Sequence, residues 1–89
     1  MTERAVHIRN ALGLHARAAA RFVHTASRFR SRVTVSRNGK TMDGKSILGI
    51  LLLAASQGTV LRLAAEGEDE AAAVQALAAL VESGFGEES

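Results

Sequence analysis

The residues with the clearest chemical potential are His15 and Arg17, in the stretch NALGLHARAAARF over residues 10–22. Gly13 permits a sharp turn, and the helix predicted to follow would present its first unpaired N–H groups at residues 16–18. The positive end of that helix should favour an uncharged imidazole, the nucleophilic form of histidine. The same N–H groups and the Arg17 guanidinium could hold phosphoryl oxygens. This combination suits reversible phosphorylation of a histidine.

The sequence offers no partner that would let His15 complete a catalytic cycle. No second acid, base or metal ligand lies near it in the chain, and no cofactor loop, metal-ligand set or catalytic triad can be assembled elsewhere. The chain has no cysteine, which excludes thiolate metal sites. The other histidines, His7 and His24, fall on the polar sides of their predicted elements. We therefore expect a carrier that is not itself an enzyme and that uses no metal or cofactor.

Composition predicts a single domain over residues 1–89. Ten of the eleven Lys and Arg residues lie between Arg4 and Lys45, and seven of the nine acidic residues lie from Glu66 onward. This split predicts one basic and one acidic face. The N-terminus lacks a signal-peptide pattern, and the apolar stretch 50–55 is too short to span a bilayer. We expect a soluble, cytoplasmic protein without membrane insertion.

Periodicity predicts seven elements in the order β-α-β-β-α-β-α. Strands are expected over 5–9, 32–37, 40–43 and 59–66, with Asn38-Gly39 as a hairpin turn. Helices are expected over 15–29, over 47–55 with Ser46 as N-cap and Gly58 just after the end, and from the acidic cluster 68–70 to about Gly84. Residues 85–89 are expected to be a loose tail. This order predicts an α+β fold with a small antiparallel sheet covered by helices on one face.

Two motifs carry a resemblance to a known family. GLHAR followed by a helix resembles the phosphorylation-site motif of HPr, the family of histidine-containing phosphocarriers in the phosphoenolpyruvate-dependent phosphotransferase system. NGKTMDGKSILGILLLAA resembles the second signature of the family, and QGTVLRLAAEGEDEAAAVQALAALVESGFGE resembles its last strand and helix. The resemblance thus covers essentially the whole chain. It implies an open-faced β-sandwich, a four-stranded antiparallel sheet covered on one face by three helices.

The resemblance also implies specific roles. His15 would accept a phosphoryl group on Nδ1 from phospho-enzyme I and donate it to an enzyme IIA, with Arg17 and the backbone amides of Ala16, Arg17 and Ala18 holding the phosphate. The family usually has proline where this chain has Ala18. Alanine there should loosen the start of the helix by about 0.4–1 kcal/mol through the entropy of the unfolded chain.

The second motif suggests regulation and docking. Ser46 is a natural N-cap, and it also matches the family serine that HPr kinase/phosphorylase modifies. Ile50 and Leu53 should face the core. Three other apolar side chains, Ile47, Leu48 and Leu51, should reach a partner next to Ala20 and Arg21. An alternative is an HPr-fold regulatory protein that acts through Ser46 phosphorylation and partner binding, but the presence of His15 and Arg17 argues against it.

A nucleic-acid-binding module is the other rival that the basic half suggests. Tyr and Trp are absent from the chain, so the aromatic platforms typical of single-strand binding are missing. We therefore expect no nucleic-acid partner, and by analogy with the family we expect a monomer. The sequence leaves open whether the acceptor serves sugar transport or a nitrogen- or regulation-linked branch.

Overall fold

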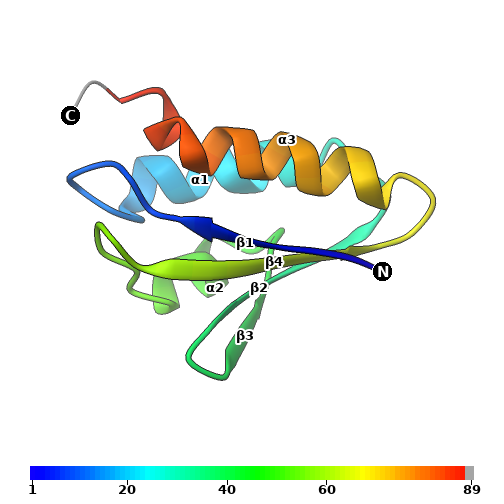
Figure 1. The fold of residues 1–89 in the computed structure, drawn as a ribbon, viewed down its shortest axis with the longest axis horizontal. Coiled ribbons are helices and arrows are strands. Elements are labelled where there is room, and N and C mark those ends of the chain that lie inside the picture. Colours follow the sequence, from blue (N-terminus) through cyan, green and yellow to red (C-terminus); the bar gives the residue numbers. More distant parts are fainter. Residues whose placement is uncertain (88–89) are drawn as a thin grey trace.

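Alternation of apolar and polar residues builds one antiparallel sheet. The computed structural model describes residues 1–87 and contains strands β1 (Thr2–His7), β2 (Arg32–Arg37), β3 (Lys40–Asp43) and β4 (Val60–Glu66). The strands are hydrogen-bonded in the order β1-β4-β2-β3. Figure 1 shows the sheet strongly twisted, with the β2–β3 hairpin extending away from the body of the protein.

The strand register places the apolar residues on one face of the sheet. Val6 is opposite Leu61 and Val35 is opposite Leu63, and all four side chains are buried. On the other face polar residues meet, as where Ser36 is opposite the exposed Arg62. Because strand side chains alternate between faces, one face carries the core and the other faces solvent.

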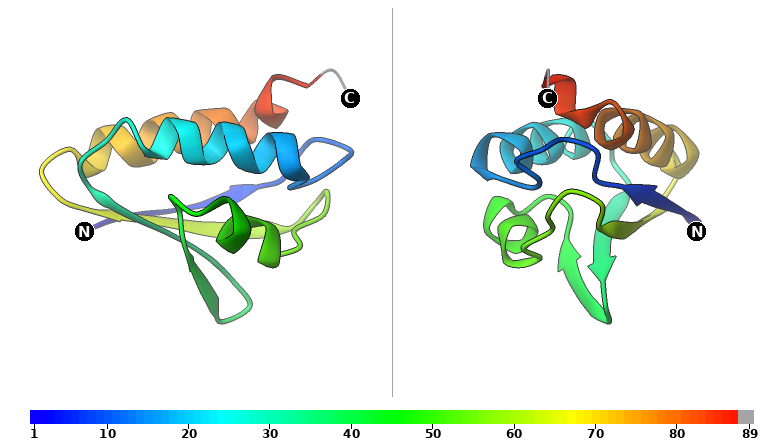
Figure 2. Two further views of the ribbon diagram at one scale, coloured as in Figure 1. Left: turned by 180° about the vertical axis from the view of Figure 1, so that it is seen from behind. Right: turned by 60° about the vertical axis from the view of Figure 1, so that its left-hand side comes forward.

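Three helices cover the apolar face of the sheet. They are α1 (Ala16–Ala26), α2 (Ile47–Leu52) and α3 (Glu70–Glu82). The views in Figures 1 and 2 show α1 and α3 side by side above the sheet, with the short α2 next to α1. Phe22, Ile50 and Leu77, one from each helix, are at most 1% exposed and join the core. The predicted α+β class and open-faced sandwich are confirmed.

The elements are shorter or shifted relative to the sequence prediction. The helix expected over 15–29 ends at Ala26, the one expected over 47–55 ends at Leu52, and the first strand begins at Thr2 and ends at His7. Gly58 was expected just after the end of the second helix, but α2 ends six residues earlier, at Leu52. The left-handed residue after α2 is Ala54 (φ +50°), and Gly58 belongs to the turn that leads into β4.

The expectation of a loose C-terminal tail is wrong for residues 85–87. Gly84–Gly86 form a 3₁₀ turn, and Phe85 is 1% exposed. Gly84, Phe85 and Gly86 all have positive φ, at 71°, 59° and 76°. The chain therefore turns back toward the N-terminal half of α1. The apolar Phe85 side chain explains this, because burying it in the core offsets the cost of a left-handed backbone. Residues 88–89 lie outside the described part.

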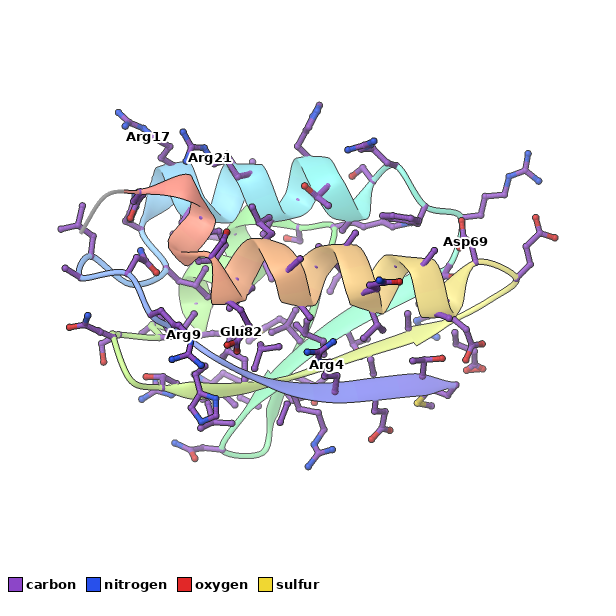
Figure 3. The ribbon with its side chains drawn as sticks, turned by 45° about the horizontal axis from the view of Figure 1, so that its top comes forward. Arg4, Arg9, Arg17, Arg21, Asp69 and Glu82 are labelled. Carbon is purple, nitrogen blue, oxygen red and sulfur yellow. The ribbon has the colours of Figure 1, made fainter. Side chains whose placement is uncertain are left out.

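The basic and acidic halves of the chain meet across the fold. The Arg9 guanidinium lies 2.8 Å from Glu82 (Figure 3), and Arg30 lies 3.6 Å from Glu68. The predicted division into one basic and one acidic face is therefore crossed by ion pairs. Within residues 1–87, no helix has the length and apolar character needed to cross a membrane.

The acidic cluster before α3 has a tertiary role. The Asp69 carboxylate accepts hydrogen bonds from the Ser31 hydroxyl (2.5 Å) and from the backbone amides of Arg30 and Ser31 (2.9 Å each). The Ser31 hydroxyl, followed by the Arg30 amide, holds the pKa of Asp69 below its ordinary value. Asp69 therefore fastens the loop between α1 and β2 to the start of α3.

Candidate functional site

The loop that presents His15 is fixed by backbone contacts. Gly13 adopts φ +65°, and a Cβ there would approach within 2.5 Å of the Ala55 carbonyl oxygen. The next amide, of Leu14, donates to that same oxygen at 2.9 Å. Glycine is therefore required both for the backbone conformation and for the close approach. This contact places His15 at a defined point between β1 and α1.

His15 is the N-cap residue of α1, but its side chain does not cap the helix. Its carbonyl accepts the Ala19 amide at 2.9 Å. The amides of Ala16, Arg17 and Ala18 make no hydrogen bond that is found within residues 1–87. The imidazole and these three donors thus lie at the same end of α1 with their chemistry unused, where the helix dipole favours an anion.

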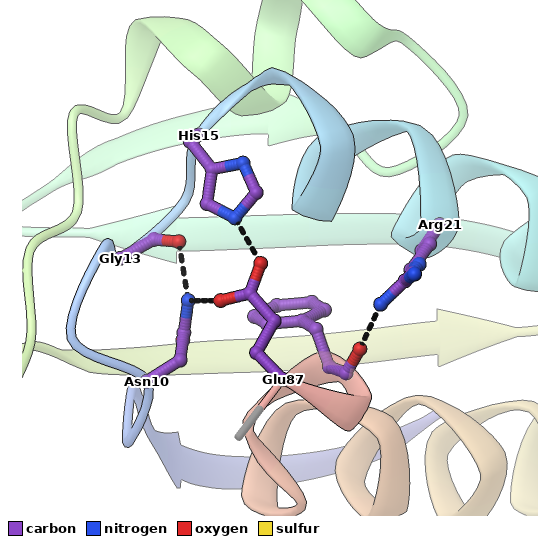
Figure 4. A network of polar contacts seen from close by, with 6 residues as sticks. Asn10, Gly13, His15, Arg21 and Glu87 are labelled. Atoms are coloured by element: carbon purple, nitrogen blue, oxygen red, sulfur yellow. Dashed lines mark hydrogen bonds and ion pairs between the residues drawn. The ribbon is translucent and has the colours of Figure 1, made fainter. Parts of the chain in front are cut away.

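A carboxylate that we did not expect at this site contacts the imidazole. Glu87 Oε2 pairs with His15 Nε2 (Figure 4), although the two residues are 72 positions apart. The side chains are 26% and 14% exposed, respectively, so the pair is partly shielded from water. In Figure 4 the other ring nitrogen, Nδ1, lies on the side away from Glu87.

Asn10 holds the second oxygen of Glu87. Its Nδ2 group donates to Glu87 Oε1 and to the Gly13 carbonyl, both at 2.8 Å, and the residue is 1% exposed. The Asn10 Oδ1 atom is buried without a partner in the described part of the chain. Turning the amide over would place this oxygen against two acceptors, so the observed orientation is the favourable one.

The ionisation of Glu87 reflects these neighbours. Partial burial raises the pKa of its carboxyl. The hydrogen bonds from Asn10 and His15, together with the positive charge of Arg21, outweigh that effect and hold the pKa below its ordinary value. Glu87 is therefore a carboxylate at neutral pH, able only to accept hydrogen bonds.

The C-terminal segment is anchored so that Glu87 reaches the site. Phe85 is buried, and the Arg21 guanidinium donates to its carbonyl oxygen (Figure 4). The Glu87 amide donates to the Gly84 carbonyl at 3.0 Å, which closes the turn. We expected Arg21 to contribute to docking, and in the structure its guanidinium also contacts this segment.

Arg17 lies in the first turn of α1, two residues after the N-cap His15. Its side chain is exposed and extends outward from the protein (Figure 3). Within residues 1–87 it makes no hydrogen bond or ion pair. The structure thus keeps Arg17 near the start of the helix without bringing it into contact with His15.

Ser46 caps α2, as the sequence predicts. Its Oγ accepts the Gly49 amide at 3.0 Å. Ile50 and Leu53 are buried, also as predicted. Ile47 and Leu48 are 44% and 68% exposed.

The other residues predicted for the docking surface differ in exposure. Ala20 and Arg21 on α1 are exposed. Leu51 was expected to reach a partner, but it is partly buried and packs against the core, because α2 is only six residues long and lies close to α1. Leu12 and Leu52, which the sequence reasoning did not single out, are 70% and 53% exposed.

Sequence reasoning missed Asn10 and Glu87 as site residues. Asn10 stands in the quoted motif, and a buried asparagine at a loop edge would have been a reasonable candidate. Glu87 had one available signal, the isolated Phe85 between two glycines, which is typical of a turn that inserts a side chain into a core. Within residues 1–87, no group of three or more His, Cys, Asp or Glu side chains could hold a metal ion.

Comparison with known proteins agrees with this architecture. Residues 2–83 match the family model described as the PTS HPr component phosphorylation site. The chain is 51% identical to the phosphocarrier protein HPr of Xylella fastidiosa over 89 residues, covering 100% of both chains. It superposes on HPr-C-His from Thermoanaerobacter tengcongensis with a TM-score of 0.96 at 52% identity, again covering 100% of both. A crystal structure of an HPr dimer from the same organism gives 0.78 at 52% identity, covering 98% of this chain and 100% of that one.

Proposed function

Because the chain belongs to the HPr family of phosphocarrier proteins of the phosphotransferase system, we propose that it carries the phosphoryl group on His15. Phospho-enzyme I would be the donor and an enzyme IIA the acceptor. The observation that supports this assignment is the position of His15 at the N-cap of α1, next in the chain to the amides of Ala16, Arg17 and Ala18, which have no hydrogen-bond partner within residues 1–87. A phosphoryl group on Nδ1 would lie at the positive end of α1.

Arg17 is proposed to complete the phosphate site. Its guanidinium is exposed and free to rotate on a long side chain, and it starts from the same helical turn as the three amides. A phosphoryl group brings three terminal oxygens, two of which a guanidinium can bind in a bidentate manner. We therefore expect Arg17 to turn toward His15 when the histidine is phosphorylated.

The exposed apolar residues around the site are proposed to receive the partner proteins. Ile47 and Leu48 present aliphatic surface from α2, and Ala20 and Arg21 are exposed on the neighbouring α1. Leu51 would contribute only the part of its side chain that packing leaves accessible. An apolar centre with a charged rim is the usual composition of a protein interface. We propose that the protein works in the cytoplasm as a monomer, which sedimentation at working concentrations would test.

Ser46 supports a second, regulatory role. Its hydroxyl lies at the start of α2, beside Ile47 and Leu48. A phosphate is electrostatically tolerated at a helix start, but its charge beside the docking residues would repel an acidic partner. We propose modification by an HPr kinase/phosphorylase type of enzyme. A Ser46→Asp variant should then keep its fold and accept phosphate from enzyme I more slowly than the wild type. Ser46→Ala should accept phosphate at the wild-type rate.

The acceptor role is tested by intact mass after incubation with enzyme I, Mg²⁺ and phosphoenolpyruvate. The protein should gain one phosphoryl group that is lost in acid and stable in base. His15→Ala should gain none. His24→Ala is the matched control, since His24 is exposed on the same helix, and it should be phosphorylated normally. Phosphorylation of His15→Ala, or none of the wild type with a competent enzyme I, would refute the proposal.

A further inference from the structure

The C-terminal turn gives His15 a carboxylate partner, and this contact has consequences for the chemistry of the ring. We infer that Glu87 is a positioning residue for phosphoryl transfer, an inference that rests on the proposed role of His15. By accepting a hydrogen bond from Nε2–H, the Glu87 carboxylate selects the ring tautomer whose Nδ1 lone pair is free. Nδ1 is then the nitrogen that takes the phosphoryl group.

The first support is that the hydrogen bond between His15 and Glu87 can have only one direction, with the ring as donor and the carboxylate as acceptor. Glu87 is ionised at neutral pH and cannot donate, so the proton of the neutral ring must lie on Nε2. Neutral histidine carries one ring proton, so Nδ1 is left with its lone pair. A carboxylate that orients a catalytic or metal-binding histidine in this way is a recurring arrangement in proteins.

The second support is that Glu87 is itself held on both oxygens. Oε1 receives the Asn10 amide at 2.8 Å, and Oε2 faces His15. The remaining hydrogen of the Asn10 amide goes to the Gly13 carbonyl, at 2.8 Å. Asn10 is 1% exposed, and the buried Phe85 anchors the segment two residues before Glu87. The carboxylate is thus fixed by the folded core.

Phosphoryl transfer to Nδ1 requires no proton to leave that nitrogen. The Nδ1 lone pair forms the N–P bond while the bond from phosphorus to the donor atom breaks, and that electron pair leaves with the donor. The Nε2 proton stays on the ring, which gains positive charge as the bond forms. Glu87 faces that charge and stabilises it. Donation to the next acceptor is the reverse of this step.

The hydrogen-bond pattern predicts an unusual order of variant effects. In Glu87→Gln the side-chain oxygen must face Asn10, which can only donate there, so the new NH₂ group faces His15. Nε2 must then accept, the ring proton moves to Nδ1, and the nucleophilic lone pair is blocked. In Glu87→Ala, water replaces the carboxylate and both tautomers are populated. The nearly isosteric Gln variant is therefore expected to be the more damaging, whereas a purely structural role predicts the opposite.

Two measurements on the full chain test this inference. Nitrogen-15 NMR of the unphosphorylated proteins, at a pH where the ring is neutral, reports which nitrogen carries the proton. Potassium phosphoramidate then serves as a small phosphoryl donor that needs no docking surface, and in this reaction the P–N bond of the reagent breaks and ammonia leaves. Glu82→Gln is the matched control, because Glu82 pairs with Arg9 instead of His15.

We expect the Nε2–H tautomer in the wild type and in Glu82→Gln, and Nδ1–H in Glu87→Gln. Glu87→Gln should react at least about tenfold more slowly than the wild type, with Glu87→Ala in between. A wild-type ring protonated on Nδ1, a Gln variant no slower than Ala, or no reaction of His15 with phosphoramidate would overturn the inference. Reaction with phosphoramidate but not with phospho-enzyme I would refute the proposed donor and leave the role of Glu87 standing.

Discussion

The C-terminal turn should be part of the cooperative core, and Phe85→Ala measures this directly. Phe85 is 1% exposed, and replacing a buried Phe by Ala typically lowers the free energy of unfolding by about 3–5 kcal/mol. Because the segment lies near the chain end and can partly collapse into the space, we expect the lower limit of about 3 kcal/mol. For a domain of this size that loss corresponds to a fall in Tm of roughly 12–24 °C.

Urea and thermal unfolding, followed by circular dichroism, are suitable assays for this loss. Leu48→Ala is the control, since Leu48 is 68% exposed and its truncation should change the free energy of unfolding by less than about 0.5 kcal/mol. Phe85→Leu should retain most of the stability because it keeps most of the apolar volume. A Phe85→Ala variant within about 1 kcal/mol of the wild type would refute the packing argument and would indicate that the turn opens independently of the core.

Three further outcomes follow from local contacts. Ser46→Ala should lower the free energy of unfolding by about 1 kcal/mol because the Gly49 amide loses its acceptor, and an unchanged urea midpoint would count against the cap. Ala18→Pro should raise it by about 0.4–1 kcal/mol, since this first-turn amide has no partner within residues 1–87; a destabilised variant would contradict this. The Ser31 hydroxyl and other donors lower the pKa of Asp69 in the folded protein. The contribution of Asp69 to folding stability is therefore full above its ordinary pKa of 3.8 and is lost as the pH falls through its lower pKa in the folded state. Asp69→Asn should remove that part of the acid dependence of stability, and an acid dependence like that of the wild type would show that Asp69 is not its source.

Local sequence patterns predicted the type and order of the helices and strands. The ends of these elements depend on tertiary contacts and were predicted less accurately. The strands at 32–37 and 40–43 and the Asn38-Gly39 turn between them depend on neighbouring residues, and these parts of the prediction agree with the structure. The first strand, expected over 5–9, lies instead at Thr2–His7. The exact ends of α1 and α2 were not predicted, because they depend on tertiary contacts. After α2 the first left-handed residue is Ala54, four positions before Gly58.

The site shows the same division between local and distant information. His15 and the amides of residues 16–18 belong to one stretch of chain, so their proximity could be predicted from the sequence. Glu87 is 72 residues away from His15, and its arrival depends on Phe85 being buried and on Asn10 pointing inward. No periodicity near His15 encodes that contact.

Locating the phosphoryl group by phosphorus–nitrogen NMR in the phosphorylated, nitrogen-15-labelled protein tests the central claim most directly. The account predicts one phosphorus nucleus coupled to Nδ1 of His15, with Nε2 still facing Glu87. Coupling to Nε2 of His15, or a phosphoryl group on His7, His24 or Ser46 after incubation with enzyme I and phosphoenolpyruvate, would contradict it.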